Sequence, residues 1–531
     1  MSKLSKVWFV ANIYKIRILI LVLLLYLFFP LFILGILVLQ LIRKCVEIWA
    51  KIRIKQVDTI MSPESALVAD DDLYGIPSNT VALFVLNGQV TVDNLRRLMY
   101  ENIISKQNAA GKLLYPQLQQ FPVRCCKFMF WVWDEDFNIE AHVRLHRVVS
   151  DTDENKVWNE TDILKLQANL LRKQWMRNKS LWELELVPNY STSARTSSTR
   201  QLKTVMLIRF HESLGDIASW FRLFLTSLCD NEEGHSLSNH HHSSSPSSST
   251  PHKSEEKVRG TYINTTGIMW RCIYERFRTT LVLPLYFARA LLQPSEEDNH
   301  CWRVEEKELV KRDHFKIIDK FSVQHIKDIK LLLGVNFTSV ILAATASAIR
   351  TTLLTLGQVP KSILVELPTM TKACQCDIRD NICTYRSPIS IRLPIGVASS
   401  KERLRLCQEF YSKSKQSREA TCHGMIRHFL GFFPITWIKP IQRKLKCSGT
   451  LLNLPCTTEY FSMFSSPVED VIVASTKENG FTITFLSYAD FIRMSLVIDH
   501  RLIPANRDNV AKNLLKNFYS DLIVLGIEVV V

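Results

Sequence analysis

The chain has 531 residues and a formal net charge of +15, and 47% of its residues are hydrophobic and 10% aromatic. A chain of this length is too long for a single compact core, so we expect two or three domains. The apolar content excludes a disordered chain. Basic residues gather near the N-terminus, where residues 1–60 hold nine Lys and Arg against two acidic residues. No zinc-finger, basic-heptad or RNA-binding aromatic motif accompanies them, so we expect anionic lipid as a partner and no nucleic acid.

Residues 18–42 carry no charged side chain and form a run long enough to cross a bilayer. No small-residue cleavage site follows the run, so residues 1–55 are predicted to be an uncleaved membrane anchor with basic flanks. Pro30 lies near the middle of the run and both flanks are basic, so a kinked single span and a re-entrant hairpin both fit. The endoplasmic reticulum is the expected membrane, with the plasma membrane and the lipid droplet as alternatives. Residues 45–55 predict an amphipathic helix at the membrane interface.

Strands and helices alternate from residue 56 onward, which predicts an α/β fold. The first half contains strands at 80–86, 128–133 and 204–210 and helices at 91–99, 163–177 and 218–225. Thr91 is a candidate N-cap of the helix that follows it. The Ser- and His-rich residues 231–256 are predicted to form a disordered insertion. Residues 269–292 fit either an interfacial helix or a core-facing connector.

The second half repeats the alternation. Helices are predicted at 322–333, 340–354 and 507–525 and strands at 362–368, 387–394 and 480–486, with residues 334–339 as a turn. The two halves are similar in length, so we divide the soluble part into lobes 56–295 and 296–531 with a site between them.

One short segment carries the chemistry. The sequence His211-Glu212-Ser213-Leu214-Gly215-Asp216-Ile217 lies between a predicted strand and a predicted helix. This layout resembles the HHxxxDG active-site motif of the CoA-dependent acyltransferase superfamily. It is most similar to the His-His-Ser-Leu-Gly-Asp-Gly form of the wax ester synthase/diacylglycerol acyltransferase family. The chain departs from that form at Glu212, where the family has its second histidine, and at Ile217, where the family has glycine.

Further landmarks of the family occur in the same order, so the resemblance covers roughly residues 58–531. They lie at residues 61–66, 136–144, 179–183, 334–350, 381–394, 453–457 and 487–499. The resemblance implies two chloramphenicol-acetyltransferase-like lobes with a tunnel between them, preceded by the N-terminal transmembrane segment. It implies transfer of a fatty acyl group from acyl-CoA, as a substrate and with no cofactor, to a long-chain alcohol or diacylglycerol. The alternative is a catalytically impaired pseudoenzyme that binds acyl-CoA or lipid.

Acyl transfer to an alcohol needs a base for the hydroxyl proton and donors for the oxyanion. By family register Glu212 is the base, and burial in an apolar tunnel would raise the pKa of such a carboxyl group. His211 could serve only if the turn shifted, since adjacent strand residues face opposite sides, and a structural role is its other interpretation. Asp216 is expected to shape the turn and to pair with an arginine, and Gly215 to meet a requirement of the turn.

The resemblance places two further polar residues at the tunnel. Asn453 and Thr338 are predicted to bind the substrate carbonyl, although either could be an ordinary loop residue. Thirteen cysteines are scattered without a metal-binding pattern. The cluster Cys374, Cys376 and Cys383 has no common zinc spacing, so no metal is expected.

Overall fold

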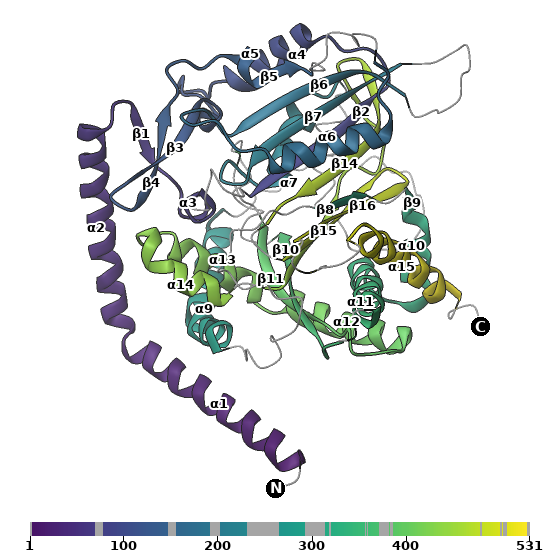
Figure 1. Ribbon diagram of the computed structural model, residues 1–531. Coiled ribbons are helices and arrows are strands. Elements are labelled where there is room, and N and C mark those ends of the chain that lie inside the picture. The colour runs from purple at the N-terminus through teal and green to yellow at the C-terminus, as the bar shows by residue number, and fades with distance from the viewer. Residues whose placement is uncertain are drawn as a thin grey trace, which may run out of the picture.

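Two lobes, each built around a β-sheet, form the body of the molecule, and a long bent helical segment runs along one side (Figure 1). This computed structural model describes residues 3–69, 78–146, 156–191, 202–230, 265–292, 314–317, 320–355, 357, 359–370, 382, 386–445, 447–477, 480–499, 502 and 507–527. The α/β fold with two lobes agrees with the sequence-based prediction. The predicted insertion at 231–256 lies outside the described residues.

The sheet of the first lobe has the strand order β13-β14-β2-β7-β6-β5. Its strands are β2 Asn79–Leu86, β5 Val143–Leu145, β6 Trp182–Tyr190, β7 Lys203–His211, β13 Ser462–Met463 and β14 Ser466–Ser475. The helices of this lobe are α3 Pro63–Ala69, α4 Val92–Met99, the π-helix Tyr100–Ile104, the 3₁₀ helix Pro116–Gln119, α5 Ile139–His142, α6 Glu160–Arg172 and α7 Ile217–Ser227. All of β2 is buried, because α6 covers one face of the sheet and α4 and α7 cover the other.

The sheet of the second lobe has the order β11-β10-β12-β15-β16-β8, with β9 beside β16. Its strands are β8 His314–Ile317, β9 Phe321–Ser322, β10 Ile363–Met370, β11 Arg386–Leu393, β12 Gly449–Pro455, β15 Phe481–Tyr488 and β16 Phe491–Ile498. Its helices are α10 Val323–Leu333, α11 Phe337–Thr355, α12 Ser400–Gln416, α13 Glu419–Leu430, α14 Ile435–Leu445 and α15 Arg507–Ile527. Within the described residues, α11 is the helix long and apolar enough to cross a membrane, and 72% of its apolar window is buried in the protein.

One strand ties the two lobes together. Although β14 belongs to the second half of the chain, it pairs antiparallel with β2 from Val468 to Ser475. The chain then returns to the second lobe as β15. A division of the chain at residue 295 assigns β13 and β14 to the second lobe. The pairing of β14 with β2, and of β13 with β14, instead places both strands in the sheet of the first lobe.

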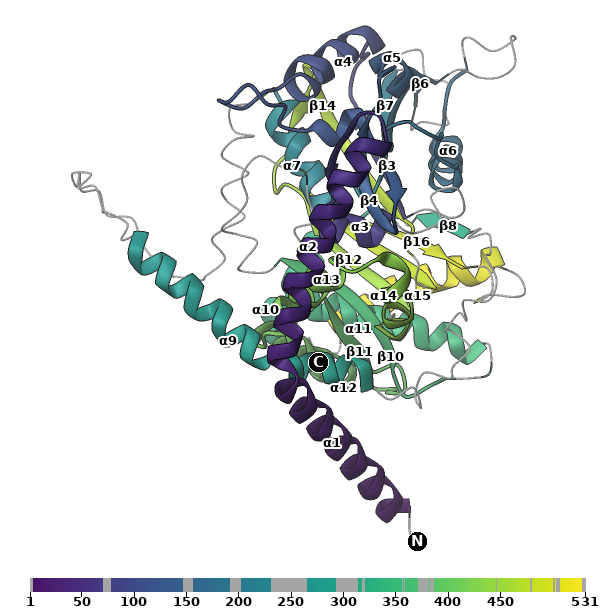
Figure 2. The same ribbon diagram turned by 90° about the vertical axis from the view of Figure 1, so that its left-hand side faces the viewer.

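The N-terminal segment is two helices, α1 Lys3–Leu27 and α2 Phe29–Arg53, separated at Phe28 just before Pro30. Figure 1 and Figure 2 show that the two helices bend at this break and do not fold back as a hairpin would. Residues 45–53 are the end of α2 and not a separate interfacial helix. The transmembrane assignment itself stays a prediction.

The end of α2 lies against a small sheet of order β1-β4-β3, formed by β1 Val57–Ile60, β3 Gln120–Cys125 and β4 Phe128–Trp133. α1 contacts α9 Thr265–Leu292, and the Tyr26 hydroxyl donates a hydrogen bond to the Leu281 carbonyl. α9 packs on α13 and α14, as a core-facing connector would, while Tyr274, Phe277 and Leu281 are exposed. Its place in a membrane interface stays a prediction.

Most element boundaries agree with the sequence to within a few residues. Thr91 caps α4 as predicted, because its side chain accepts a hydrogen bond from the Asn94 N–H. The start of α11 differs from the prediction: the helix begins at Phe337, so Thr338 lies in its first turn and not in a preceding loop. The turn before it ends α10 at Gly334, whose φ of 61° is the left-handed conformation that glycine adopts without a steric penalty.

Candidate active site

The segment singled out in the sequence forms a tight link between β7 and α7. β7 is a central strand paired with β2 and β6, and it ends at His211. Asp216 is the N-cap of α7, and its Oδ1 accepts a hydrogen bond from the Ser219 N–H at 2.9 Å. This cap fixes the turn. The predicted arginine partner of Asp216 stays a prediction. Gly215 is buried in the turn and its φ is not positive, so the turn does not need glycine for a left-handed backbone there.

His211 faces the interior of the first lobe. Its side chain is fully buried, and its Nδ1 accepts a hydrogen bond from the Ser213 N–H at 3.2 Å and lies 2.8 Å from the Ser213 Oγ. Its backbone N–H donates to the Leu181 carbonyl at 3.0 Å. These contacts hold the ring inside its own lobe and fit the structural interpretation of this histidine.

Glu212 points to the place where the chain crosses between the lobes. Its carboxylate Oε1 forms an ion pair with the Lys477 ammonium and lies 3.5 Å from the Ser475 Oγ. Ser475 ends β14 and Lys477 lies two residues beyond, before the chain enters β15. The two side chains of the ion pair are 15% and 23% exposed. The sequence led us to expect an apolar tunnel around this carboxylate, and the structure places the Lys477 ammonium beside it instead.

A buried network of charges supports β7 beneath the turn. The Arg209 guanidinium, whose side chain is 1% exposed, bonds the Glu183 carboxylate of β6 at 2.7 Å and lies over the Trp175 ring at 3.7 Å. Glu183 also pairs with Lys173 at 2.7 Å. Burial raises the pKa of Glu183, but the charges of Arg209 and Lys173 outweigh it and lower that pKa to about 2. The network therefore fixes the strand that ends in His211.

The two predicted carbonyl-binding residues meet in the second lobe. Asn453 lies on β12 and Thr338 in the first turn of α11, and the Asn453 Nδ2 donates to the Thr338 Oγ1 at 3.2 Å. Both side chains are only partly buried. The structure thus forms two pairs from the predicted residues and Lys477, one at the crossover and one between β12 and α11. A tunnel joining them stays a prediction.

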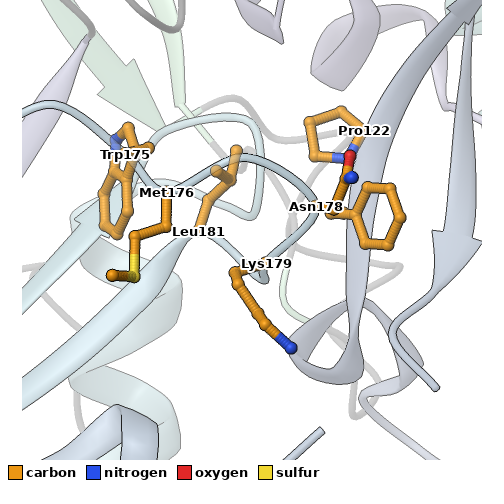
Figure 3. A pocket seen from close by; sticks show the side chains of 7 residues that line it. Pro122, Trp175, Met176, Asn178, Lys179 and Leu181 are labelled. Atoms are coloured by element: carbon orange, nitrogen blue, oxygen red, sulfur yellow. The ribbon is translucent and has the colours of Figure 1, made fainter. Parts of the chain in front are cut away.

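A small hollow lies beside the motif, on the loop between α6 and β6 (Figure 3). Its lining is Phe121, Pro122, Trp175, Met176, Asn178, Lys179 and Leu181. In Figure 3 Trp175 and Met176 lie on one side of the loop and Pro122 on the other. Its volume of about 10 Å³ is close to the least that holds one water molecule. This hollow therefore has no room for an acyl chain.

Metal chemistry gains no support from the part of the chain that the structure describes. Within it, no group of three or more His, Cys, Asp or Glu side chains could hold a metal ion. The cluster Cys374, Cys376 and Cys383 lies outside the described residues.

Comparison with known proteins connects this geometry to a family. Residues 387–520 match the family model of the WS/DGAT C-terminal domain. The chain is 22% identical over 403 residues to wax ester synthase/diacylglycerol acyltransferase 9 of Arabidopsis thaliana, covering 71% of this chain and 80% of that protein. The chain is related to the wax ester synthase/diacylglycerol acyltransferases.

Solved structures share the fold. The wax ester synthase/diacylglycerol acyltransferase of Marinobacter aquaeolei VT8 superposes with a TM-score of 0.55 at 15% identity, over 89% of this chain and 100% of that one. The first condensation domain of the calcium-dependent antibiotic synthetase gives a TM-score of 0.55 at 12% identity, over 89% of this chain and 96% of that one. The two-lobed α/β architecture is therefore that of the condensation and chloramphenicol-acetyltransferase type.

Lys477 is the site residue that sequence reasoning missed. It lies 265 residues beyond Glu212 and outside the landmarks that resemble the wax ester synthase/diacylglycerol acyltransferase family. The pairing of β14 with β2 brings Lys477 to the motif, and no local sequence pattern predicts that pairing. The sequence offers one signal for this partner: Lys477 is a basic residue that lies just after a strand in the second half of the chain.

Proposed function

We propose that the protein is a membrane-bound O-acyltransferase that moves a fatty acyl group from acyl-CoA to a long-chain alcohol or to diacylglycerol, making wax ester or triacylglycerol. The observation that carries this proposal is the position of Glu212. It occupies the base position of the family motif, on a capped strand-turn-helix link, where it faces the crossover between two lobes of the acyltransferase type.

In the proposed reaction Glu212 accepts the hydroxyl proton of the acceptor as its oxygen attacks the thioester carbonyl. The new C–O bond forms, the C–S bond breaks, and the proton is delivered to the sulfur of the departing CoA. When Glu212 becomes neutral, the Lys477 ammonium loses its counter-charge and can stabilise the developing oxyanion. Asn453 and Thr338 supply polar groups for the carbonyl from the second lobe.

The same ion pair supports a second candidate function. A carboxylate is intrinsically a weaker base than the imidazole of the family motif, and this carboxylate is already engaged in an ion pair. A protein with the same two lobes could then bind acyl-CoA or lipid without turning it over.

Membrane attachment is assigned to the N-terminal helices. Apolar side chains are exposed along α1 and α2, including Leu19, Leu23, Leu27, Leu31, Leu34 and Leu41. Water would oppose so much exposed apolar surface, whereas a bilayer would cover it. The exposed Tyr274 and Phe277 of α9, which contacts α1, would lie at the same surface. We propose the endoplasmic reticulum as the membrane, with the plasma membrane and the lipid droplet as alternatives.

The test expresses the chain in cells that lack other neutral-lipid synthases and follows labelled acyl-CoA into wax ester and triacylglycerol. Glu212→Ala should reduce turnover by about 10²- to 10⁴-fold, the usual contribution of a general base. Lys477→Gln should reduce turnover less, because it removes the ammonium that faces the developing oxyanion but leaves the base in place.

Absence of ester synthesis by the wild type would contradict the proposed acyltransferase activity. Restoration of turnover by Glu212→His in that case would establish an intact scaffold that has lost its base, as the second candidate function requires. Lys55→Gln, the same charge change at an exposed position away from the motif, is the matched control and should leave the turnover unchanged.

A further inference from the structure

A groove lies between α2 and the body of the protein, away from the active-site motif. It has a volume of about 440 Å³, within the range of small-molecule sites. Its lining is Leu37, Gln40, Leu41, Arg43, Lys44, Glu47, Ile60 and Phe432. One part of the lining is therefore apolar and the other carries charge.

Arg43 is the central residue of the charged part. Only 8% of it is exposed, and its guanidinium donates to the carbonyls of Gly431 at 3.3 Å, Phe432 at 3.4 Å and Met61 at 3.3 Å. It also lies over the Phe432 ring at 5.1 Å. These contacts use at most three of the five guanidinium N–H donors, so at least two are left for a ligand.

Arg43 makes no direct ion pair with the described residues around it, and Glu47 acts on its charge only at longer range. Among the described residues, no carboxylate oxygen lies within 4.0 Å of its guanidinium, and the nearby Glu47 is held by Lys44 at 2.9 Å and Lys51 at 3.4 Å. The groove lining carries Arg43 and Lys44 against Glu47, a net charge of +1. A buried cation without a counter-ion is costly, so this site is suited to an anion supplied from outside.

The position of the groove along α2 indicates which kind of anion would bind there. N-terminal to it α2 exposes an uncharged apolar surface, with Leu31, Leu34 and Leu37 all more than half exposed. The first charged residues after that surface are Arg43 and Lys44. The groove therefore lies where the hydrocarbon core of a bilayer would give way to head groups.

We propose that this groove binds an anionic phospholipid, with the phosphate at Arg43 and Lys44 and the beginning of an acyl chain against Leu37, Leu41 and Phe432. The bound lipid completes the contact between α2 and the body, because Arg43 holds the carbonyls at the end of α13 while it holds the phosphate. This proposal rests on the membrane attachment proposed above.

The test reconstitutes the full chain into nanodiscs of phosphatidylcholine with about 20 to 30% phosphatidylserine, which gives the bilayer a negative surface charge. Retained lipids are identified by native mass spectrometry. The wild type should retain phosphatidylserine in preference to phosphatidylcholine. Lys44→Gln should weaken that preference about fivefold, the contribution of one basic residue near an anionic surface. Lys44 is exposed, so this change leaves the docking of α2 intact, whereas Arg43→Gln could undo it.

Lys55→Gln is again the matched control, because this exposed lysine lies beyond the groove and pairs with Glu135. Three results would overturn the proposed site. They are equal retention of the two lipids by the wild type, an equal loss of the lipid preference in Lys55→Gln and Lys44→Gln, and displacement of the lipid by millimolar inorganic phosphate. Failure of the wild type to enter nanodiscs would overturn the membrane attachment and this proposal together, and it would be recognised before any lipid is analysed.

Discussion

Glu183→Gln is expected to destabilise the first lobe while it changes the shape of one buried side chain very little. The glutamine keeps the volume and can still accept a hydrogen bond, but it removes the negative charge that faces Arg209. Arg209 is 1% exposed, so its guanidinium would be left buried without its main counter-ion. We expect the loss of stability to extend to the turn that begins at His211, two residues after Arg209.

The expected loss of stability can be worked out from the pKa of the Glu183 carboxyl group. The pKa of Glu183 is lowered from 4.5 to about 2 in the folded protein, although burial alone would raise it. A difference of this size corresponds to about 3 kcal/mol of stability at neutral pH. Removal of one partner from a buried ion pair costs a similar amount, about 3–5 kcal/mol.

Urea unfolding in detergent, followed by far-UV circular dichroism, measures the difference between wild type and Glu183→Gln. Because the folded pKa is depressed, the stabilisation is fully present above about pH 4.5 and is lost as the pH falls toward 2. The two proteins should therefore converge in stability as the pH is lowered through this window. Glu185→Gln on the same strand is the control and should cost less, since its partners Arg144 and His146 are partly exposed. A difference below about 0.5 kcal/mol at pH 7, the usual range for a surface change, would refute the reasoning.

Two further predictions concern the contact between α13 and α3. In Gly431→Ala the added Cβ would lie 2.2 Å from the Pro63 carbonyl oxygen, so we expect a loss of about 1–3 kcal/mol in urea unfolding, while Gly35→Ala, with open space around it, should cost nothing. The hydrogen bond to Glu64 raises the pKa of His428, so this ion pair stabilises the fold at low pH and is lost as the pH rises through the folded pKa. His428→Gln should remove this pH dependence near neutrality, and an unchanged melting profile between pH 5 and 8 would contradict the assignment.

Local features of the chain were predictable because local residues determine them. The buried strand β7, the capping Asp216 and the helix α7 follow from neighbours in sequence, and so does the cap at Thr91. The start of α11 was misplaced because Thr338 is a weak helix former, and its packing in the second lobe outweighs that preference.

The environment of Glu212 could not be predicted in the same way. The motif places Glu212 at the end of a strand, and an apolar tunnel was the natural expectation for its surroundings. Its partner Lys477 arrives through the pairing of β14 with β2, which joins segments almost 400 residues apart. Sequence patterns describe which residues form a strand, but they do not say which distant strand becomes its neighbour.

The insertion of β14 between β13 and β2 also has a consequence for biosynthesis. When the first half of the chain leaves the ribosome, one edge of β2 has no neighbour, because its partner begins at Ser466. At about 5–20 residues per second, the wait between Leu86 and Ser466 is on the order of 20–80 s. Throughout that time an apolar strand edge is open to other chains. The first lobe cannot mature as an independent unit during translation, so truncated products that end before residue 466 should depend on chaperones and be degraded quickly.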